Sequence, residues 1–133
     1  MSLVVQCHPR APLGPDAGLS RQLDVFRDGA PAHEFEAVCE ALDCDVQSAT
    51  GAGGALLALT KQVLVGEAEH GEVDGNGWII RVDSRVVTCS GLYGQGGGEI
   101  GTPLFHALLV EYVAFLSDSH KRSRSVLLLP VRS

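Results

Sequence analysis

The glycine-rich stretch over residues 94–101 carries the sharpest chemical signal in this chain. Gly96, Gly98 and Gly101 match the pattern G-x-G-x-x-G between an expected strand and an expected helix, which is the setting of a dinucleotide-binding loop. Such a site also needs a second parallel strand that ends in an acidic residue for the ribose. The next expected strand, VLLLPVRS, has no acidic residue. The pattern therefore favours a flexible glycine loop, and no cofactor is expected.

Cysteine and histidine side chains, the common nucleophiles and metal ligands, form no motif of either kind. The chain has four cysteines without a C-x-x-C pair and five scattered histidines, so we expect no metal site. A nucleophile pair such as Cys89 with His106 would require a spatial proximity that the sequence does not indicate. We therefore expect no catalytic residue and interpret the chain as non-enzymatic.

Acidic residues gather in two places. Glu34, Glu36 and Glu40 form one group, and Glu67 and Glu69 form the other. Paired carboxylates can perform acid–base chemistry. Charged side chains are nevertheless mostly exposed in folded proteins, so we expect both groups to lie on solvated faces.

Composition limits the kinds of partner that the chain can have. The net charge of −6 disfavours nucleic acid and anionic membranes, because their binding depends on clustered Lys and Arg. No run of about 18 apolar residues and no signal peptide is found, so we expect neither a membrane span nor secretion. A cytoplasmic location is expected, with the nucleus as a second compartment. In such a compartment the cysteines would be reduced thiols.

A strongly apolar helix is expected over residues 103–117. Thr102 could cap its first turn, and Pro103 suits a first helical position because proline lacks the N–H that is unpaired there. Apolar residues cover more than half of its circumference, which is too much for a helix with one face in water. Either the helix is fully buried or it contacts a sheet on one side and a partner chain on the other. The predicted partner-binding side chains are Leu104, Phe105, Leu108, Leu109, Tyr112, Val113, Phe115 and Leu116.

The remaining pattern predicts antiparallel strands. After a flexible arm (residues 1–19), in which residues 3–6 could lie on a sheet edge, LDVFR is expected to pair with HEFEAV across an Asp-Gly turn. A helix over residues 33–42 remains an alternative, because Glu and Ala are strong helix formers. Further strands are expected at residues 55–60, 62–66, 78–82, 85–89 and 126–131, with turns at 74–77 and 83–84. The prediction is one α+β domain (residues 20–133) with an antiparallel sheet or sandwich of about six strands and a long apolar helix before the last strand.

Several segments resemble the small proteasome assembly chaperones, in particular the third member of that family. R-Q-L-D-V at residues 21–25 and G-A-P-A-H at residues 29–33 resemble its K-Q-x-x-E-V and G-V-P-T-Q entry hairpin. L-L-A-L-T at residues 56–60, Gly94-Gln95 with the helix at 105–117, and V-L-L-L at 126–129 resemble its apolar strand, its loop and helix, and its closing strand. Lys61-Gln62-Val63 replaces the family's Gly-Lys-Met-Gly turn, and residues 67–76 look like an insertion.

The resemblance implies a protein without catalytic activity. Proteins of that family dimerise, and the dimer holds α-subunits of the 20S core during ring assembly. The expected partners are therefore proteasome α-subunits and a second chaperone subunit, identical or related. Two alternatives remain: a small acidic binding protein such as an immunity or inhibitor protein, and a nucleotide-binding enzyme that uses the loop from Gly94 to Gly101.

Overall fold

This chain folds into two antiparallel sheets with helices packed between and beside them in a computed structural model, which describes residues 2–9 and 21–130. The first sheet, called sheet A, has the strand order β3-β2-β1-β8, and sheet B has the order β4-β5-β6-β7. Sheet A consists of β1 (Ser2–Cys7), β2 (Leu23–Arg27), β3 (Ala30–Pro31) and β8 (Arg124–Pro130). Sheet B consists of β4 (His70–Asp74), β5 (Trp78–Asp83), β6 (Val86–Gly91) and β7 (Gly97–Gly101).

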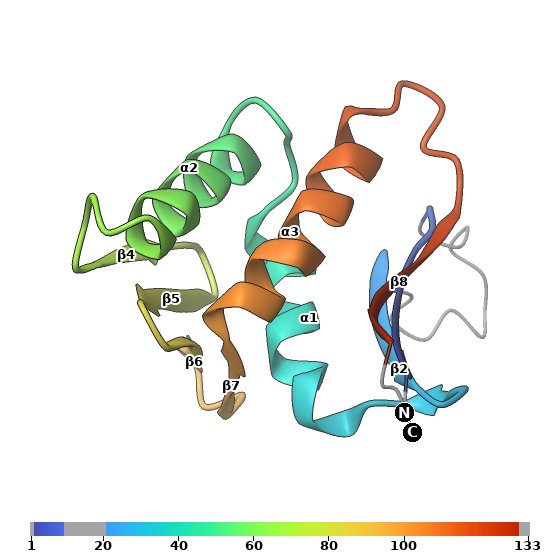
Figure 1. Cartoon of the computed structure of the whole chain (residues 1–133), viewed down its shortest axis with the longest axis horizontal. Coiled ribbons are helices and arrows are strands. Elements are labelled where there is room, and N and C mark those ends of the chain that lie inside the picture. The colour runs from blue at the N-terminus through green and yellow to red at the C-terminus, as the bar shows by residue number, and fades with distance from the viewer. Residues whose placement is uncertain (1, 10–20, 131–133) are drawn as a thin grey trace.

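The described residues form three α-helices, two of which lie between the sheets. They are α1 (Glu36–Asp45), α2 (Ala52–Leu64) and α3 (Thr102–Ser117), and a short 3-10 turn, η1 (His33–Phe35), precedes α1. Figure 1 shows α1 and α3 between sheet B on the left and sheet A on the right. The helix α2 packs on α3 and on β4 and β5. The predicted α+β class is thus confirmed, and so is the long helix before the last strand.

Strand β1 lies in the middle of sheet A. Val5 pairs with Val25 of β2 on one side and with Val126 of β8 on the other. Leu3, Val5 and Cys7 point toward the helices and are buried, as the two-residue period of a strand requires. The expectation of a sheet edge at residues 3–6 was wrong, and the predicted arm over residues 1–19 begins with this central strand. Residues 10–19 of that arm lie outside the described residues.

Residues 33–42 are helical, which corrects the predicted long hairpin. The Asp28-Gly29 turn does form, with φ of 51° and 84°, but β2 then pairs with only two residues of β3. After Pro31 the chain turns away into η1 and α1. Val38, Cys39, Ala41 and Leu42 are buried there at helical spacing. The helix propensity of Glu and Ala is therefore realised because two sheets are present to cover the apolar face.

Residues 55–66 form most of α2 and its end instead of two strands. Leu56, Thr60 and Val63 follow the helical period and are buried. Gly53 allows the close approach to α3, because a Cβ atom there would lie 3.3 Å from Cγ2 of Val113. The Ala- and Leu-rich segment contains few β-branched residues, and its propensity for a helix prevails.

Sheet B follows the predicted turns. The turn between Asp74 and Trp78 joins β4 to β5, and Asp83 joins β5 to β6 by accepting hydrogen bonds from the backbone N–H groups of Arg85 and Val86, both at 2.8 Å. Residues 97–101, expected as part of a flexible loop, are strand β7. A strand needs only backbone pairing with its neighbour, so a run poor in side chains can complete a sheet.

Candidate functional site

The predicted partner-binding face of α3 lies inside the chain. Six of its eight side chains are buried: Phe105, Leu108, Leu109, Tyr112, Phe115 and Leu116. The other two, Leu104 and Val113, are partly buried against the same core. Sheet A and sheet B together with α2 cover this helix, so the structure corrects the prediction of an exposed interface at these residues. The large apolar residue that α3 does expose is Val110, at 39%.

The residues of the glycine motif lie in three different settings. Gly96 is in the β6–β7 turn with φ of 90°, Gly98 lies within β7, and Gly101 precedes α3. Strands β6 and β7 are antiparallel, whereas a dinucleotide site is built on parallel strands. Thr102, the predicted helix cap, instead donates its hydroxyl hydrogen to the carbonyl oxygen of Asp83 at 2.7 Å. The motif therefore does not have the geometry of a phosphate-binding loop.

The buried cysteines are poor nucleophiles. Burial raises the pKa of Cys7, Cys39 and Cys89 to about 12, so these thiols stay protonated at neutral pH. His106, which was weighed as a counterpart of Cys89 but not expected to pair with it, lies half-buried on α3. Among the described residues, no group of three or more His, Cys, Asp or Glu side chains could hold a metal ion.

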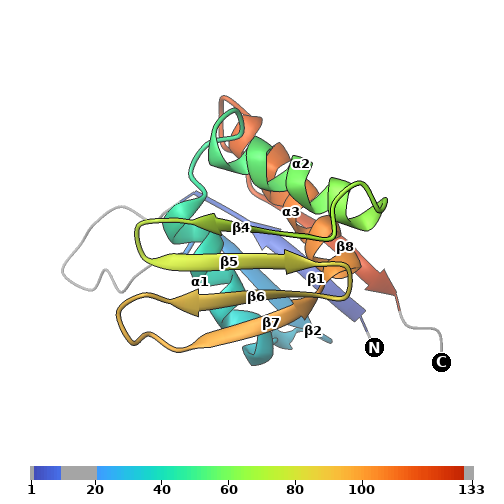
Figure 2. The same ribbon diagram turned by 90° about the vertical axis from the view of Figure 1, so that its left-hand side faces the viewer.

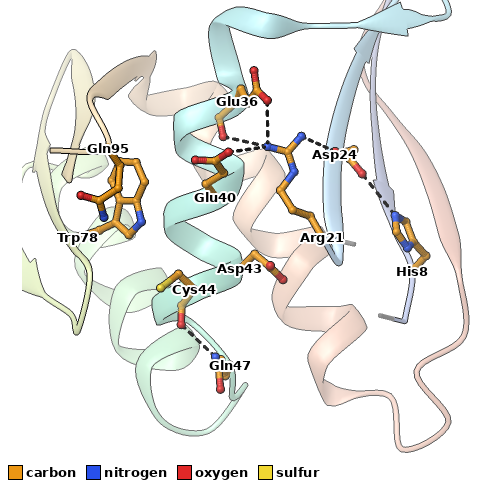
Figure 3. A pocket seen from close by; sticks show the side chains of 10 residues that line it. All are labelled: His8, Arg21, Asp24, Glu36, Glu40, Asp43, Cys44, Gln47, Trp78 and Gln95. Carbon is orange, nitrogen blue, oxygen red and sulfur yellow. Dashed lines mark hydrogen bonds and ion pairs between the residues drawn. The ribbon is translucent and has the colours of Figure 1, made fainter. Parts of the chain in front are cut away.

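An open cavity of about 790 Å³ extends around α1 between the two sheets. Figure 3 shows Arg21, Asp24 and His8 on the side of sheet A, and Trp78 and Gln95 on the side of sheet B. Its lining residues are His8, Arg21, Asp24, Glu36, Glu40, Asp43, Cys44, Gln47, Trp78 and Gln95. Sequence reasoning missed this grouping because its members come from distant segments.

Arg21 is the centre of the charged part of this cavity. Its guanidinium donates to Oδ1 of Asp24 at 2.8 Å, and Nη1 lies 3.7 Å from a carboxylate oxygen of Glu36 and 3.5 Å from one of Glu40. Nε2 of His8 lies 3.3 Å from the second oxygen of Asp24. Because one arginine faces three carboxylates, these groups position one another and the cavity stays acidic.

A second surface lies on the outer face of sheet A. Pro31 pairs with Phe26, Phe26 with Val4, and Val4 with Leu127, so the four side chains form one row across the sheet. We call these four residues the outer row. Leu127 is 53% exposed, Pro31 is exposed, and Phe26 and Val4 are half-buried. The outward face of an antiparallel sheet is usually polar, so an apolar row there is unusual.

No family model matches the sequence, and neither the curated proteins nor the solved structures contain a match to it. Within the described residues, none of the helices combines the length and the apolar character that a membrane crossing requires.

Proposed function

We propose that this chain is a non-enzymatic protein whose partners are other proteins, and that it acts as an assembly chaperone. The observation that carries the proposal is the outer row, because apolar side chains on a solvent-facing sheet surface usually mark a protein interface. The row ends at Leu127 on β8, which is the last strand of sheet A. A partner strand along β8 would cover the exposed end of the row.

The occupant of this edge is a second chaperone subunit. Residues 125–129 of β8, Ser-Val-Leu-Leu-Leu, carry no charge, although natural sheet edges are commonly protected by charged residues. Pro130 ends the stretch that can pair, because proline lacks the N–H group. Two antiparallel β8 strands related by a two-fold axis near Leu127 would place the same surface on both sides of the contact. In this proposal the dimer interface is β8 and the outer row, in place of α3.

The chemistry of the cavity around α1 supports binding over catalysis. Its carboxylates Asp24, Glu36 and Glu40 are engaged by Arg21. Following the resemblance of the sequence to the small proteasome assembly chaperones, the clients of the dimer are α-subunits of the 20S core.

The dimer is tested by light scattering after size-exclusion chromatography, with the wild type and two variants. We expect a concentration-dependent dimer for the wild type and a monomer for Leu127→Lys. The control is Val65→Lys, which changes another exposed aliphatic side chain, 60% exposed, in the segment after α2 and leaves the dimer intact. A wild type that remains monomeric at all concentrations, or a dimeric Leu127→Lys, would contradict the proposed interface.

The clients are tested by affinity capture from a cell lysate followed by mass spectrometry. Recovery of proteasome α-subunits by the wild type, and their loss with a variant that keeps the fold, is the expected result. Capture without any α-subunit would overturn the chaperone assignment. Recovery of a basic nuclease would support the second candidate, an acidic inhibitor or immunity protein, which the carboxylates exposed along α1 favour.

A further inference from the structure

The edge of sheet B at β7 borders a groove. In Figure 2, β7 is the outermost strand of this sheet, and α1 lies behind it. The groove has a volume of about 440 Å³ and lies between the start of β7 and the exposed side of η1 and α1. Its lining residues are His33, Glu34, Glu36, Ala37, Glu40, Gln95, Gly96 and Gly97. It therefore combines a sheet edge with a helix wall, the arrangement in which a peptide can add a strand to a sheet.

The wall of the groove on the β7 side has little side-chain bulk. Gly96 and Gly97 supply it, and a Cβ atom added at Gly96 would meet nothing within 4 Å. On its other edge β7 is paired with β6, with Ser90 opposite Gly97 and Cys89 opposite Gly98. Among the described strands none pairs with the free edge of β7. An incoming backbone could therefore approach this edge closely.

The opposite wall is acidic. Glu34, Glu36 and Glu40 are exposed along η1 and α1. Glu34 forms an ion pair with Arg27, and the other two lie near Arg21, whose closest carboxylate is Asp24. Four carboxylates thus share two guanidinium groups, and the wall keeps a net negative charge. A partner segment with lysine or arginine side chains would neutralise the remaining negative charge of this wall.

An exposed aromatic residue lies in the same turn as the groove residues Gln95 and Gly96. Tyr93 in the β6–β7 turn is 79% exposed. Its backbone N–H donates to Oε1 of Gln95 at 2.6 Å, while Nε2 of Gln95 donates to the carbonyl oxygen of Gly77 at 2.9 Å. Gln95 thereby links the β6–β7 turn, which carries Tyr93, to the neighbouring β4–β5 turn. A solvent-exposed aromatic ring can contact a cationic side chain through its face.

We propose that this groove binds an extended, basic segment of a partner protein as a fifth strand of sheet B. Backbone hydrogen bonds to β7 supply affinity, and the carboxylates of α1 select lysine and arginine at alternate positions of the guest. This inference rests on the proposed function only in taking the partner to be a protein. It is independent of the dimer, because the groove and β8 lie on different sheets.

The probe is a fluorescently labelled octapeptide that alternates Lys with Thr, with blocked ends, and binding is followed by fluorescence anisotropy. We expect saturable binding that weakens with added salt, because exposed charges are screened. The matching peptide that alternates Glu with Thr should not bind. Absence of binding by the Lys peptide up to millimolar concentration, or equal binding of the Glu peptide, would overturn the proposal.

Two further measurements separate strand addition from general attraction between opposite charges. The double variant Glu36→Gln/Glu40→Gln should weaken binding about tenfold, which corresponds to about 1.4 kcal/mol, whereas Glu67→Gln/Glu69→Gln, which removes the same charge elsewhere, should leave it unchanged. A Lys-Thr peptide with N-methyl groups on alternate residues should lose binding, because it has no backbone N–H groups to donate along one of its edges. Equal losses in both double variants, or full binding of the methylated peptide, would contradict strand addition.

The same samples distinguish this inference from the dimer. Leu127→Lys should keep its affinity for the Lys peptide, and Glu36→Gln/Glu40→Gln should keep the oligomeric state of the wild type. Circular dichroism of each variant verifies that the fold is retained. Loss of peptide binding in a folded Leu127→Lys variant would show that the binding surface is not the β7 groove.

Discussion

The hydroxyl of Tyr112 donates a hydrogen bond of 3.0 Å to the backbone carbonyl oxygen of Val46, which joins the middle of α3 to the end of α1. Both residues are buried, and the Tyr112 ring stacks on Phe115 with 6.5 Å between centroids. A polar atom at this depth requires a partner, because burial without one costs free energy. The bond therefore links α3 to the end of α1.

Removal of this hydroxyl is expected to destabilise the fold. Tyr112→Phe keeps the ring but leaves the Val46 carbonyl without this donor, so the free energy of unfolding should fall by about 1–3 kcal/mol. Urea denaturation followed by circular dichroism measures the change. Tyr93→Phe is the control, because that hydroxyl belongs to a side chain that is 79% exposed, and its effect should be below about 0.5 kcal/mol. Equal stability of the two variants would mean that the buried bond contributes nothing.

The four cysteines should differ sharply in reactivity. Cys44 is exposed, whereas burial raises the pKa of Cys7, Cys39 and Cys89 to about 12. Iodoacetamide at pH 8 should therefore label Cys44 rapidly, and the other thiols only after unfolding. Intact-mass spectrometry follows the number of labels, and Cys44→Ser should abolish the rapid phase. Rapid labelling of the Cys44→Ser protein in its folded state would contradict the burial of the other three.

Acid should destabilise the fold through Asp83. Hydrogen bonds from the backbone N–H groups of Val86 and Arg85 lower the pKa of Asp83 below its usual 3.8. A carboxyl group with a lowered pKa in the folded state stabilises that state above pH 3.8, and this contribution is lost as the pH falls through the folded-state value. The free energy of unfolding should thus decrease below about pH 4. Asp83→Asn should show a weaker decrease, and an unchanged pH profile would disprove this role of Asp83.

The sequence was most informative about α3 and sheet B. The helix was predictable because its start at Thr102 and Pro103 and its apolar period agree, and the β4–β5 hairpin because Asp74-Gly75-Asn76-Gly77 favours a tight turn. The burial of α3 was one of two options that its pattern allowed. Whether α3 is fully buried or faces a partner depended on whether a second sheet covers it. That sheet is sheet A, whose strands come from segments near both ends of the given sequence, far from the pattern of α3 itself.

The helices α1 and α2 were misassigned for different reasons. In α1, alternating Glu residues imitate a half-buried strand, and only its position between two sheets favours the helical period. In α2, a short apolar run cannot be assigned from periodicity alone. The outer row and the groove between β7 and α1 were not predictable. Each depends on the register or packing of segments far apart in the sequence.

The pairing of β1 with β8 has a consequence for the order of folding. Strand β1 is made before β8 during synthesis, and it must wait for β8 before Val4 and Val5 gain their partners Leu127 and Val126. Contacts of such long sequence separation slow folding, because a long loop must close before they form. Until then α3 lacks the part of its sheet A cover that β8 supplies, and the side of β1 that pairs with β8 is an open edge. The nascent chain would therefore expose part of its most apolar helix for as long as β8 is still being made.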